Sequence, residues 1–463
     1  MLAGASGEAL SGAMRAAGVV SRSLPGERFV YRLFNRIGET LPSMAIARQA
    51  ASFSKGRPRE AMQAAAEAAA DGLAAMVQPF AGPIFDQHRQ AGRPIVLATT
   101  TPYDLVKPLA DRLGLDDVVA TRYGVNADGT YDGTIVGPFV WAAGKLEAVR
   151  TWAAEHDIDL AESFAYSDSI YDTPLLAAVG SPTVVNPDPR MVLMATARRW
   201  PILNLDVSPG VVKIPVLGVE LQQLALQFSR PSLAPYASFD IDGVEHIPSV
   251  GPAILVGNHR SYYDPAAMSM AIARSGRTVR FLGKKEVFDA PIVGQLAQAM
   301  GGIRVDRGTG SDEPLQAAAD ALAGGEVVAI MPQGTIPRGP AFFDPVLQGR
   351  WGAAKLAKMT DAPVIPIGMW GTEKVWPRSS RLPNLLNLTD PPAVRIRVGE
   401  PVELKHRSLD ADTKRIMAAI VDLLPPEARQ RHDPTPEELA ATYPPGYRGD
   451  PDAEPTRRPG TDA

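Results

Sequence analysis

The chain has 463 residues, of which 45% are hydrophobic and 21% are charged, and its formal net charge is −4. These values are ordinary for a soluble globular protein, the length suits two domains, and the charge gives no indication of a nucleic-acid partner. The absence of cysteine excludes disulfides, thiolate metal sites and a cysteine acyl-enzyme.

Strands and helices are expected to alternate in the first half of the chain. Residues 8–90 are alanine-rich and indicate helices, above all from Arg59 to Met76. Short apolar runs then predict strands at 95–98, 164–166 and 183–185, with helices ending at Leu113 and covering 145–155. Residues 126–129 and 131–133 are turn signals, and they predict that this region forms a small hairpin. This alternation is typical of a parallel α/β sheet.

The second half is expected to form another α/β domain. We predict domains at residues 1–205 and 236–424, joined by a proline-containing linker at 206–235 and followed by a disordered, proline-rich tail at 425–463. The most apolar stretch, 211–228, is interrupted by charged residues and by Pro215. Its longest run without such an interruption is shorter than the ~18–20 apolar residues that a membrane-spanning helix needs. We therefore expect it to pack on the protein or to lie at an interface.

The start of the chain, Met1 to Glu8, lacks the basic residues and the apolar core of a signal peptide. We therefore expect no secretory leader, and the absence of cysteine is consistent with a reducing compartment.

The segment from Asn258 to Asp264 places a histidine and an aspartate five positions apart after an apolar strand, 253–256. A histidine at the end of a strand can lie in a cleft, and an aspartate after the following turn can return to its ring. His259 is then a general base and Asp264 is the group that orients it. Developing negative charge on a carbonyl oxygen needs donors, which we expect to be backbone amides near the end of the strand. The alternative is that the pair only ties a loop.

Three further blocks follow this pair in order. They are Gly302-Ile303-Arg304-Val305-Asp306-Arg307 (with 283–288 before it), Met331-Pro332-Gln333-Gly334-Thr335, and Val364-Ile365-Pro366-Ile367-Gly368. Arginine forks bind phosphate, so Arg307 is the first candidate for an acceptor phosphate, with Arg304 and Lys284 as lesser ones. Arg307 can also be a surface ion-pair partner, and Pro366 fits a packed strand better than a substrate contact.

The four ordered blocks resemble the glycerolipid acyltransferases, the 1-acylglycerol-3-phosphate acyltransferases and their relatives. The resemblance implies transfer of an acyl group from acyl-CoA or acyl carrier protein to a lysophospholipid, without a cofactor, by an enzyme attached peripherally to the inner face of the cytoplasmic membrane. His259 and Asp264 are then catalytic. The implied substrate-binding residues are Asn258, Lys284, Arg304, Arg307, Gln333, Gly334 and Thr335. The family usually has glutamate where this chain has Gln333, and the change leaves the identity of the acceptor open.

Residues up to 205 resemble the haloacid dehalogenase superfamily, in its phosphoserine phosphatase-like branch with a helical cap. On that resemblance Thr99 contacts phosphate, Lys145 neutralises it, and Asp168 and Asp172 hold magnesium. The alternative for the two aspartates is a helix N-cap and a first-turn acid. The superfamily's Asp-x-Asp nucleophile and its first strand are expected to precede Met1, so we expect no phosphatase activity from the chain as written.

Three functions therefore compete at this point. The first is an O-acyltransferase of the second domain, which is expected to bind an acyl donor, a lysophospholipid and a membrane surface but no nucleic acid. The second is a magnesium-dependent phosphomonoester phosphatase of the first domain. The third is a non-catalytic module that binds a membrane surface or a partner.

Overall fold

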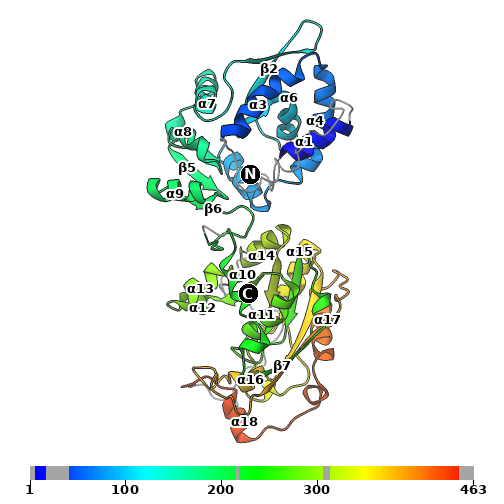
Figure 1. Ribbon diagram of the computed structural model, residues 1–463. Helices are drawn as coiled ribbons and strands as arrows, with labels where there is room; N and C mark the ends of the chain where they lie inside the picture. Colours follow the sequence, from blue (N-terminus) through cyan, green and yellow to red (C-terminus); the bar gives the residue numbers. More distant parts are fainter. Residues whose placement is uncertain (1–5, 17–40, 215–217, 306–312, 448–463) are drawn as a thin grey trace. The chain divides into compact units, whose positions relative to one another are not determined.

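The computed structural model describes residues 6–16, 41–214, 218–305 and 313–447. The chain divides into two compact units, residues 1–207 with 215–218 and residues 208–214 with 219–463 (Figure 1). Each unit has its own strands, helices and apolar core. The expected α/β class with two domains is therefore confirmed. Among the helices of the described residues, none combines the length and apolar character that crossing a membrane requires.

The N-terminal unit surrounds two small sheets with helices. Its elements are α1 (Ser6–Ala16), α3 (Leu41–Ser54), α4 (Arg59–Ala74), η1 (Pro79–Ala81), α5 (Gly82–Gln90), β1 (Val96–Pro102), α6 (Tyr103–Arg112), β2 (Asp117–Val125), β3 (Tyr131–Val136), α7 (Ala143–Glu155), η2 (Leu160–Glu162), β4 (Phe164–Ser167), η3 (Ile170–Asp172), α8 (Thr173–Leu176), β5 (Ser181–Val185), α9 (Pro189–Arg198) and β6 (Ile202–Leu203). Small alanine side chains on α4 let this helix pack closely against α1 and α6.

Asp104, in the first turn of α6, ties three elements of this unit together. Its carboxylate accepts hydrogen bonds from Arg59 and Gln63 on α4 and from the Tyr131 hydroxyl on β3, at 2.8–3.0 Å. Burial alone raises the pKa of Asp104, but these three donors outweigh burial and hold the pKa below its ordinary value. The same site raises the pKa of Tyr131, first through burial and then through its bond to Asp104.

The strands of the N-terminal unit form two separate three-stranded sheets. β1 pairs in parallel with β2, which pairs antiparallel with β3, whereas β4, β5 and β6 form the second sheet. Within the described residues, no strand pairs with the second edge of β1 or with the second edge of β4. No residue of β1 is buried, although parallel strands normally lie deep in a fold.

The C-terminal unit is built on one seven-stranded sheet in the order β10-β9-β11-β8-β12-β13-β7. Its elements are α10 (Leu221–Gln227), η4 (Pro231–Leu233), β7 (Ser238–Asp242), η5 (Val244–His246), β8 (Ala253–Gly257), α11 (Asp264–Ser275), β9 (Val279–Lys284), α12 (Lys285–Asp289), α13 (Val293–Ala299), β10 (Ile303–Val305), α14 (Glu313–Ala323), β11 (Val327–Ile330), η6 (Gly339–Phe342), α15 (Gly352–Thr360), β12 (Val364–Trp370), α16 (Thr372–Val375), β13 (Ala393–Val398), α17 (Leu409–Asp422), η7 (Pro426–Arg429) and α18 (Pro436–Ala441).

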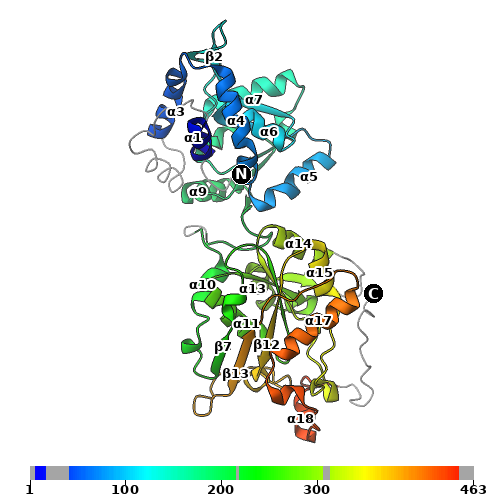
Figure 2. The same cartoon turned by 90° about the vertical axis from the view of Figure 1, so that its right-hand side faces the viewer.

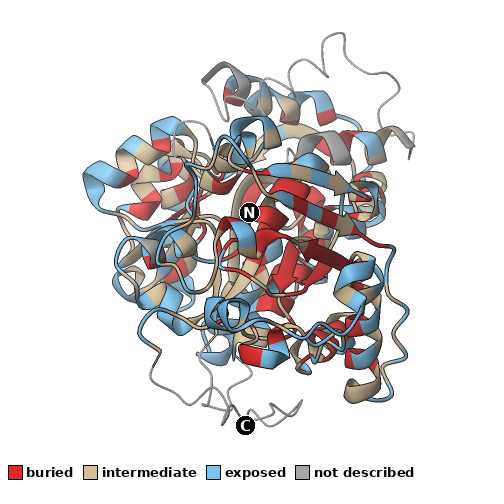
Figure 3. Cartoon of the chain, turned by 90° about the horizontal axis from the view of Figure 1, so that it is seen from below, coloured by how far each residue is buried: buried red, intermediate tan, exposed pale blue. Residues whose placement is uncertain are grey.

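Helices cover both faces of this sheet, which explains why its central strands are apolar along their whole length. One face packs on α11, and the opposite face packs on α14, α15 and α17. Figure 2 shows α10 and α11 on one side of the strands and α15 and α17 on the other. Every residue of β8 and β11 is buried, and Figure 3 shows buried residues along the strands with exposed ones on the outward faces of the helices.

Five strands, β8 to β12, run parallel to one another. Their carboxyl ends therefore lie at one edge of the sheet, and the loops that leave this edge are the natural place for a site. We call it the carboxyl edge. Pro366 is buried within β12, opposite Val256 of β8, so its interpretation as part of a packed strand is confirmed.

Of the expected linker, residues 208–214 and 219–235 belong to the C-terminal unit. Gln222 on α10 donates to and accepts from the backbone of β9, both at 2.8 Å. Glu220 pairs at 2.8 Å with Arg280, which also pairs with Glu326 at 2.7 Å. The Arg280 side chain is only 1% exposed, so two carboxylates compensate a charge that burial would otherwise make costly.

The structure also differs from the expected disordered tail. Residues 425–447 include η7 and α18, and Thr435 caps α18 in a capping box with Glu438. Directly after α18 in the chain, the Thr442 hydroxyl accepts a hydrogen bond from the backbone N–H of Gly339 at 2.8 Å. Proline and charge predict disorder here, but a capped helix and the buried Thr442 hydroxyl hold this segment in place. Residues 448–463 lie outside the described residues.

Candidate active site

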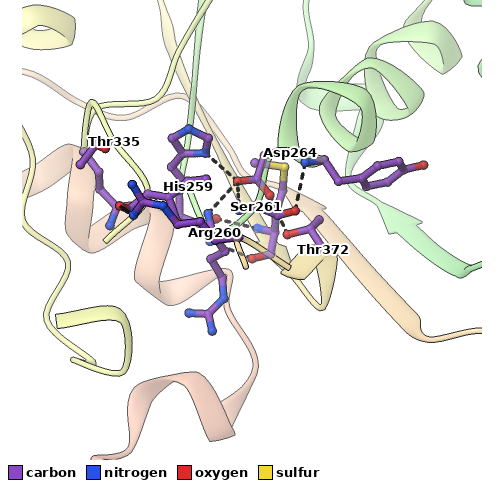
Figure 4. Close-up of polar contacts among 12 residues, drawn as sticks. His259, Arg260, Ser261, Asp264, Thr335 and Thr372 are labelled. Carbon is purple, nitrogen blue, oxygen red and sulfur yellow. Dashed lines mark hydrogen bonds and ion pairs between the residues drawn. The ribbon is translucent and has the colours of Figure 1, made fainter. Parts of the chain in front are cut away.

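His259 and Asp264 meet at the carboxyl edge, directly after β8. The distance from His259 Nδ1 to Asp264 Oδ2 is 2.7 Å, and Figure 4 shows the carboxylate pointing at the imidazole ring. Asp264 is the first residue of α11 and is completely buried, whereas the His259 side chain is 18% exposed. The pair predicted from sequence is therefore formed, with its histidine open to solvent.

The carboxylate of Asp264 is fixed by three donors besides the histidine. The backbone N–H groups of Arg260 and Ser261 donate to Oδ2 at 2.6 and 2.8 Å, and the Thr372 hydroxyl donates to Oδ1 at 2.6 Å. Its position in the first turn of a helix adds the favourable end of the helix dipole. All of these groups can donate, so the Asp264 carboxylate serves as an acceptor for each of them.

The state of the ring follows from this acceptor. When the Asp264 carboxylate accepts from the ring, the proton is on Nδ1 of His259, and a neutral ring then has its lone pair on Nε2. That nitrogen can take a proton from a substrate hydroxyl. The alternative interpretation is that the pair only ties a loop. Asp264 does hold the turn, through the backbone of Arg260 and Ser261, but it also contacts the His259 ring and so orients it.

Gln333 supports the histidine from the neighbouring strand. Its side-chain oxygen accepts the backbone N–H of His259 at 2.7 Å, and the residue is 9% exposed. Gln333 follows β11, which lies next to β8 in the sheet. The resemblance implies a substrate contact for this side chain, whereas the structure shows it holding the backbone of His259.

The backbone amides after β8 are not free for a developing oxyanion. The amide of His259 donates to Gln333, and those of Arg260 and Ser261 donate to Asp264. The expected oxyanion donors at this strand end are therefore engaged by side chains. Donors for a substrate carbonyl have to come from another part of the site.

Arg260 is a residue that sequence analysis missed. Its guanidinium lies 4.1 Å from the ring centres of both Phe342 and Trp370 and pairs with Glu373 at 3.2 Å. These contacts join the turn after β8 to the loops after β11 and β12. No local sequence signal marks this role, because its partners are 82 to 113 residues away in the chain.

Thr372 and Ser261 were also missed. Thr372 is completely buried on α16 and reaches Asp264 from 108 residues away. The Ser261 hydroxyl donates to the backbone oxygen of Trp376 at 2.7 Å. Both fasten the catalytic turn to the segment that follows β12, and only the order of strands in the sheet could have shown it.

The remaining predicted substrate residues have different surroundings. Asn258 is 1% exposed and exchanges two hydrogen bonds with the backbone of Met369, at 2.7 and 2.8 Å, so its amide links β8 to β12. Lys284, the last residue of β9, donates to the Thr335 hydroxyl at 3.1 Å. Gly334, between Gln333 and Thr335, has φ +70°, which favours glycine at this turn.

Of the two arginine candidates for phosphate binding, the structure describes Arg304 alone. Arg304 lies on edge strand β10, with its side chain 44% exposed, and pairs with Asp289 at 2.9 Å. Arg307 lies outside the described residues. Lys284 is therefore the predicted phosphate ligand that the structure does place at the carboxyl edge.

In the N-terminal unit, Lys145 and Asp172 form a buried ion pair. Their atoms approach to 2.7 Å with side-chain exposures of 7% and 8%, and the Ser167 hydroxyl also donates to Asp172 at 2.7 Å. Asp168 is exposed. Thr99 lies on β1, where its hydroxyl accepts from the backbone of Thr101 at 3.2 Å. Four residues of this unit are predicted to bind phosphate or metal. Two of the four are joined to each other, namely Lys145 and Asp172.

These residues do not fit a magnesium ion as they stand. In the described ranges, no three side chains of histidine, aspartate or glutamate gather around a common metal position. One of the two candidate carboxylates is already bound to a lysine, and a hard cation prefers several oxygen ligands. We therefore derive no chemical step through magnesium.

Comparison with known proteins identifies both regions. Residues 238–370 match the family model for acyltransferases, and residues 2–177 match the model for haloacid dehalogenase-like hydrolases. The chain is thus a fusion of a haloacid dehalogenase-like region with an acyltransferase region.

Individual relatives align with only part of the chain. It is 39% identical over 147 residues to the "Inhibition of morphological differentiation protein" of Streptomyces azureus, which is 31% of this chain and 53% of that protein. It is 33% identical over 192 residues to phosphoserine phosphatase SerB1 of Mycobacterium tuberculosis, or 41% and 61%. The alignments therefore span about half to three-fifths of these curated relatives.

Among solved structures, one similar chain is the 1-acyl-sn-glycerophosphate acyltransferase PlsC of Thermotoga maritima. It is 22% identical, covers 43% of this chain and 76% of its own, and has a TM-score of 0.34. A substrate-bound phosphoserine phosphatase is 18% identical, covers 45% and 88%, and has a TM-score of 0.30.

Proposed function

We propose that the C-terminal unit transfers an acyl group from acyl-CoA or acyl carrier protein to a hydroxyl of a phosphorylated glycerolipid, with 1-acylglycerol-3-phosphate as the first acceptor to test. The observation that carries this proposal is the His259–Asp264 pair, in which a buried and fully bonded carboxylate leaves Nε2 of a solvent-open histidine free. The match to the acyltransferase family model supports the reaction class.

The reaction follows from this arrangement. Nε2 of His259 takes the proton of the acceptor hydroxyl as its oxygen attacks the thioester carbonyl, and Asp264 stabilises the resulting imidazolium. The tetrahedral intermediate then expels the thiolate, which receives the proton from His259. The products are the ester and a free thiol, and the histidine returns to its starting state without a metal or a covalent acyl-enzyme.

A phosphorylated acceptor is supported by the cation beside the site. Lys284 stands at the end of β9, on the same carboxyl edge, and its ammonium group bonds to the Thr335 hydroxyl. A phosphate can replace or share this hydroxyl contact. Arg304 and Arg307 remain predicted partners of the same acceptor, as the resemblance implies.

A lipid acceptor also implies a place in the cell. We propose that the protein works in the cytoplasm, at the inner face of the cytoplasmic membrane, where it attaches peripherally. Attachment of this kind needs apolar or basic surface near the site rather than a spanning helix.

The direct test measures thiol release from acyl-CoA with lysophosphatidic acid as acceptor. We expect His259→Ala to lower turnover about 10²–10⁴-fold, the usual contribution of a general base. His156→Ala is a matched control, because His156 also faces an aspartate, at 3.9 Å from Asp117, but belongs to the N-terminal unit. Near wild-type turnover by folded His259→Ala would show that another residue is the base.

A further inference from the structure

Four leucines point into solvent in one short loop of the C-terminal unit. The loop follows α16, and four of the seven residues 382–388 are leucine. Their exposed fractions are 75% for Leu382, 43% for Leu385, 90% for Leu386 and 59% for Leu388. Single exposed leucines are common on protein surfaces, but a contiguous group marks a surface that meets an apolar partner. We call residues 381–388 the leucine loop.

The backbone of the leucine loop is held in place by hydrogen bonds. The N–H of Asn384 donates to the oxygen of Val375 at 2.8 Å, and the Ser380 hydroxyl donates to the oxygen of Leu382 at 2.7 Å. The Trp376 indole N–H donates to the oxygen of Ser380 at 3.2 Å. A fixed backbone therefore presents these side chains outward, so their burial on binding requires little additional ordering.

The leucine loop lies at the carboxyl edge of the sheet. It begins after β12, whose continuation supplies Thr372 to Asp264 and the backbone oxygen of Trp376 to Ser261. Arg378, just before the loop, donates to the backbone oxygen of Ile336, which follows the Gln333–Thr335 turn. The loop is thus tied by hydrogen bonds to both segments that position His259.

A second exposed apolar group leaves the same edge on the other side of β8. After β9, Ile292 is 78% exposed and Leu296 is 51% exposed. In the sheet order, β9 and β12 lie on opposite sides of β8. Apolar side chains therefore flank the strand that carries the catalytic histidine.

The charge around the leucine loop is basic. Residues 374–390 contain three cationic side chains, Lys374, Arg378 and Arg381, and one acidic side chain, Asp390. Lys374 and Arg381 are both exposed. Leucines beside exposed cations match a surface whose interior is apolar and whose outer layer is anionic.

We propose that the leucine loop docks the enzyme on an anionic lipid bilayer, with Leu382, Leu385, Leu386 and Leu388 entering the acyl region and Lys374 and Arg381 meeting lipid phosphates. The proposal rests on the proposed function, because a lipid acceptor explains why an apolar surface lies at the catalytic edge. Docking there brings the hydroxyl of an acceptor that stays partly in the bilayer to His259. This assigns membrane attachment to the leucine loop, whereas Glu220 and Gln222, within segment 211–228, are bonded to β9.

The test compares binding of the full chain to vesicles of phosphatidylcholine with phosphatidylglycerol and to vesicles of phosphatidylcholine alone. For Leu382→Ser combined with Leu386→Ser, we expect the partition coefficient on anionic vesicles to fall at least about tenfold, because two side chains no longer leave water. Arg381→Gln should weaken binding to anionic vesicles and not to neutral ones. Leu193→Ser, a leucine 74% exposed on α9 of the N-terminal unit, is the matched control and should bind as the wild type does.

A gain of signal gives a second measurement that does not depend on loss of binding. Leu386→Trp, at a position 90% exposed, should retain vesicle binding and show blue-shifted emission when vesicles are added, because the indole enters an apolar layer. Absence of this shift, or unchanged partition of the double serine variant, overturns the proposal. A protein partner for the loop instead of lipid would also leave vesicle binding unchanged and so overturns it.

The enzyme assay separates this proposal from the proposed function. With a short-chain, water-soluble lysophosphatidic acid, the double serine variant should keep wild-type turnover, whereas with acceptor in vesicles its rate should fall together with binding. Loss of turnover on both acceptors by a folded variant refutes a purely docking role. Vesicle binding by a wild type that acylates no acceptor would leave the leucine loop supported and the acyltransferase proposal refuted.

Discussion

Replacing Gln333 by leucine should slow turnover without weakening acceptor binding. The structure gives Gln333 one contact in the site, the 2.7 Å bond from the backbone N–H of His259. Leucine has a similar size and cannot accept this bond. Glutamate, in contrast, keeps an acceptor oxygen at the same reach and should preserve the position of the histidine.

The expected size follows from the burial of this bond. Gln333 is 9% exposed. The backbone N–H of His259 would therefore be left without an acceptor in a nearly buried place, which costs about 1–3 kcal/mol of free energy. If this cost falls on the orientation of the base in the transition state, the rate falls roughly 5- to 150-fold. A displaced base near the reacting atoms commonly produces losses of this order.

The assay is steady-state thiol release over a range of acceptor concentrations, with kcat and KM determined separately. We expect Gln333→Leu to lower kcat and leave the acceptor KM within about twofold, while Gln333→Glu retains most of kcat. Gln316→Leu, the same replacement at an exposed position on α14, is the control. A rise in acceptor KM with kcat unchanged would refute this reasoning and return Gln333 to acceptor binding.

Three further predictions concern the surrounding structure. Thr372→Val removes one of the donors to Asp264 and should lower kcat about tenfold with little change in either KM, since a buried hydrogen bond to a charge contributes about 1.5–3 kcal/mol. Arg280→Met should destabilise the C-terminal unit by about 3–5 kcal/mol because two buried carboxylates lose their partner, whereas Arg304→Met, at an exposed pair, should cost about 0–1 kcal/mol; hydrogen exchange of β9 reports both. The lowered pKa of Asp104 stabilises the N-terminal unit fully above the ordinary carboxyl pKa and loses that effect as pH falls through the folded value. The protection factors of the α4 amides, which correct for the intrinsic exchange rate at each pH, should therefore fall at acid pH in the wild type and depend less on pH in Asp104→Asn.

The contact between His259 and Asp264 could be predicted because the two residues are close in sequence. His259 and Asp264 are separated by one turn, so local geometry alone brings them together once 253–256 is a strand. The contacts of Gln333 and Thr372 depend instead on which strands neighbour β8. The order β11-β8-β12 is not written in any local pattern, so the supporting roles of these residues could not be read from the chain.

Two polar residues show how local chemistry misleads. Asn258 stands beside the base and resembles a substrate ligand, yet both ends of its amide are used to join β8 to β12. Arg260 resembles a solvent-exposed charge, yet the rings of Phe342 and Trp370 both lie 4.1 Å from its guanidinium. In both cases the partner is more than 80 residues away, and packing rather than composition determines the role.

Each unit pairs a basic side chain with a carboxylate, His259 with Asp264 and Lys145 with Asp172, but the surroundings of the two pairs differ. At the carboxyl edge, Asp264 has three other donors, so His259 contributes one ring nitrogen and keeps the other for chemistry. In the N-terminal unit, Lys145 and Asp172 neutralise each other in a site where neither side chain is more than 8% exposed. A phosphate there would have to displace a buried carboxylate from its lysine, which is costly because the carboxylate would keep its burial and lose its partner. Lys145 is therefore neutralised within its own unit, whereas the His259 side chain is 18% exposed and available for the proposed acyl transfer.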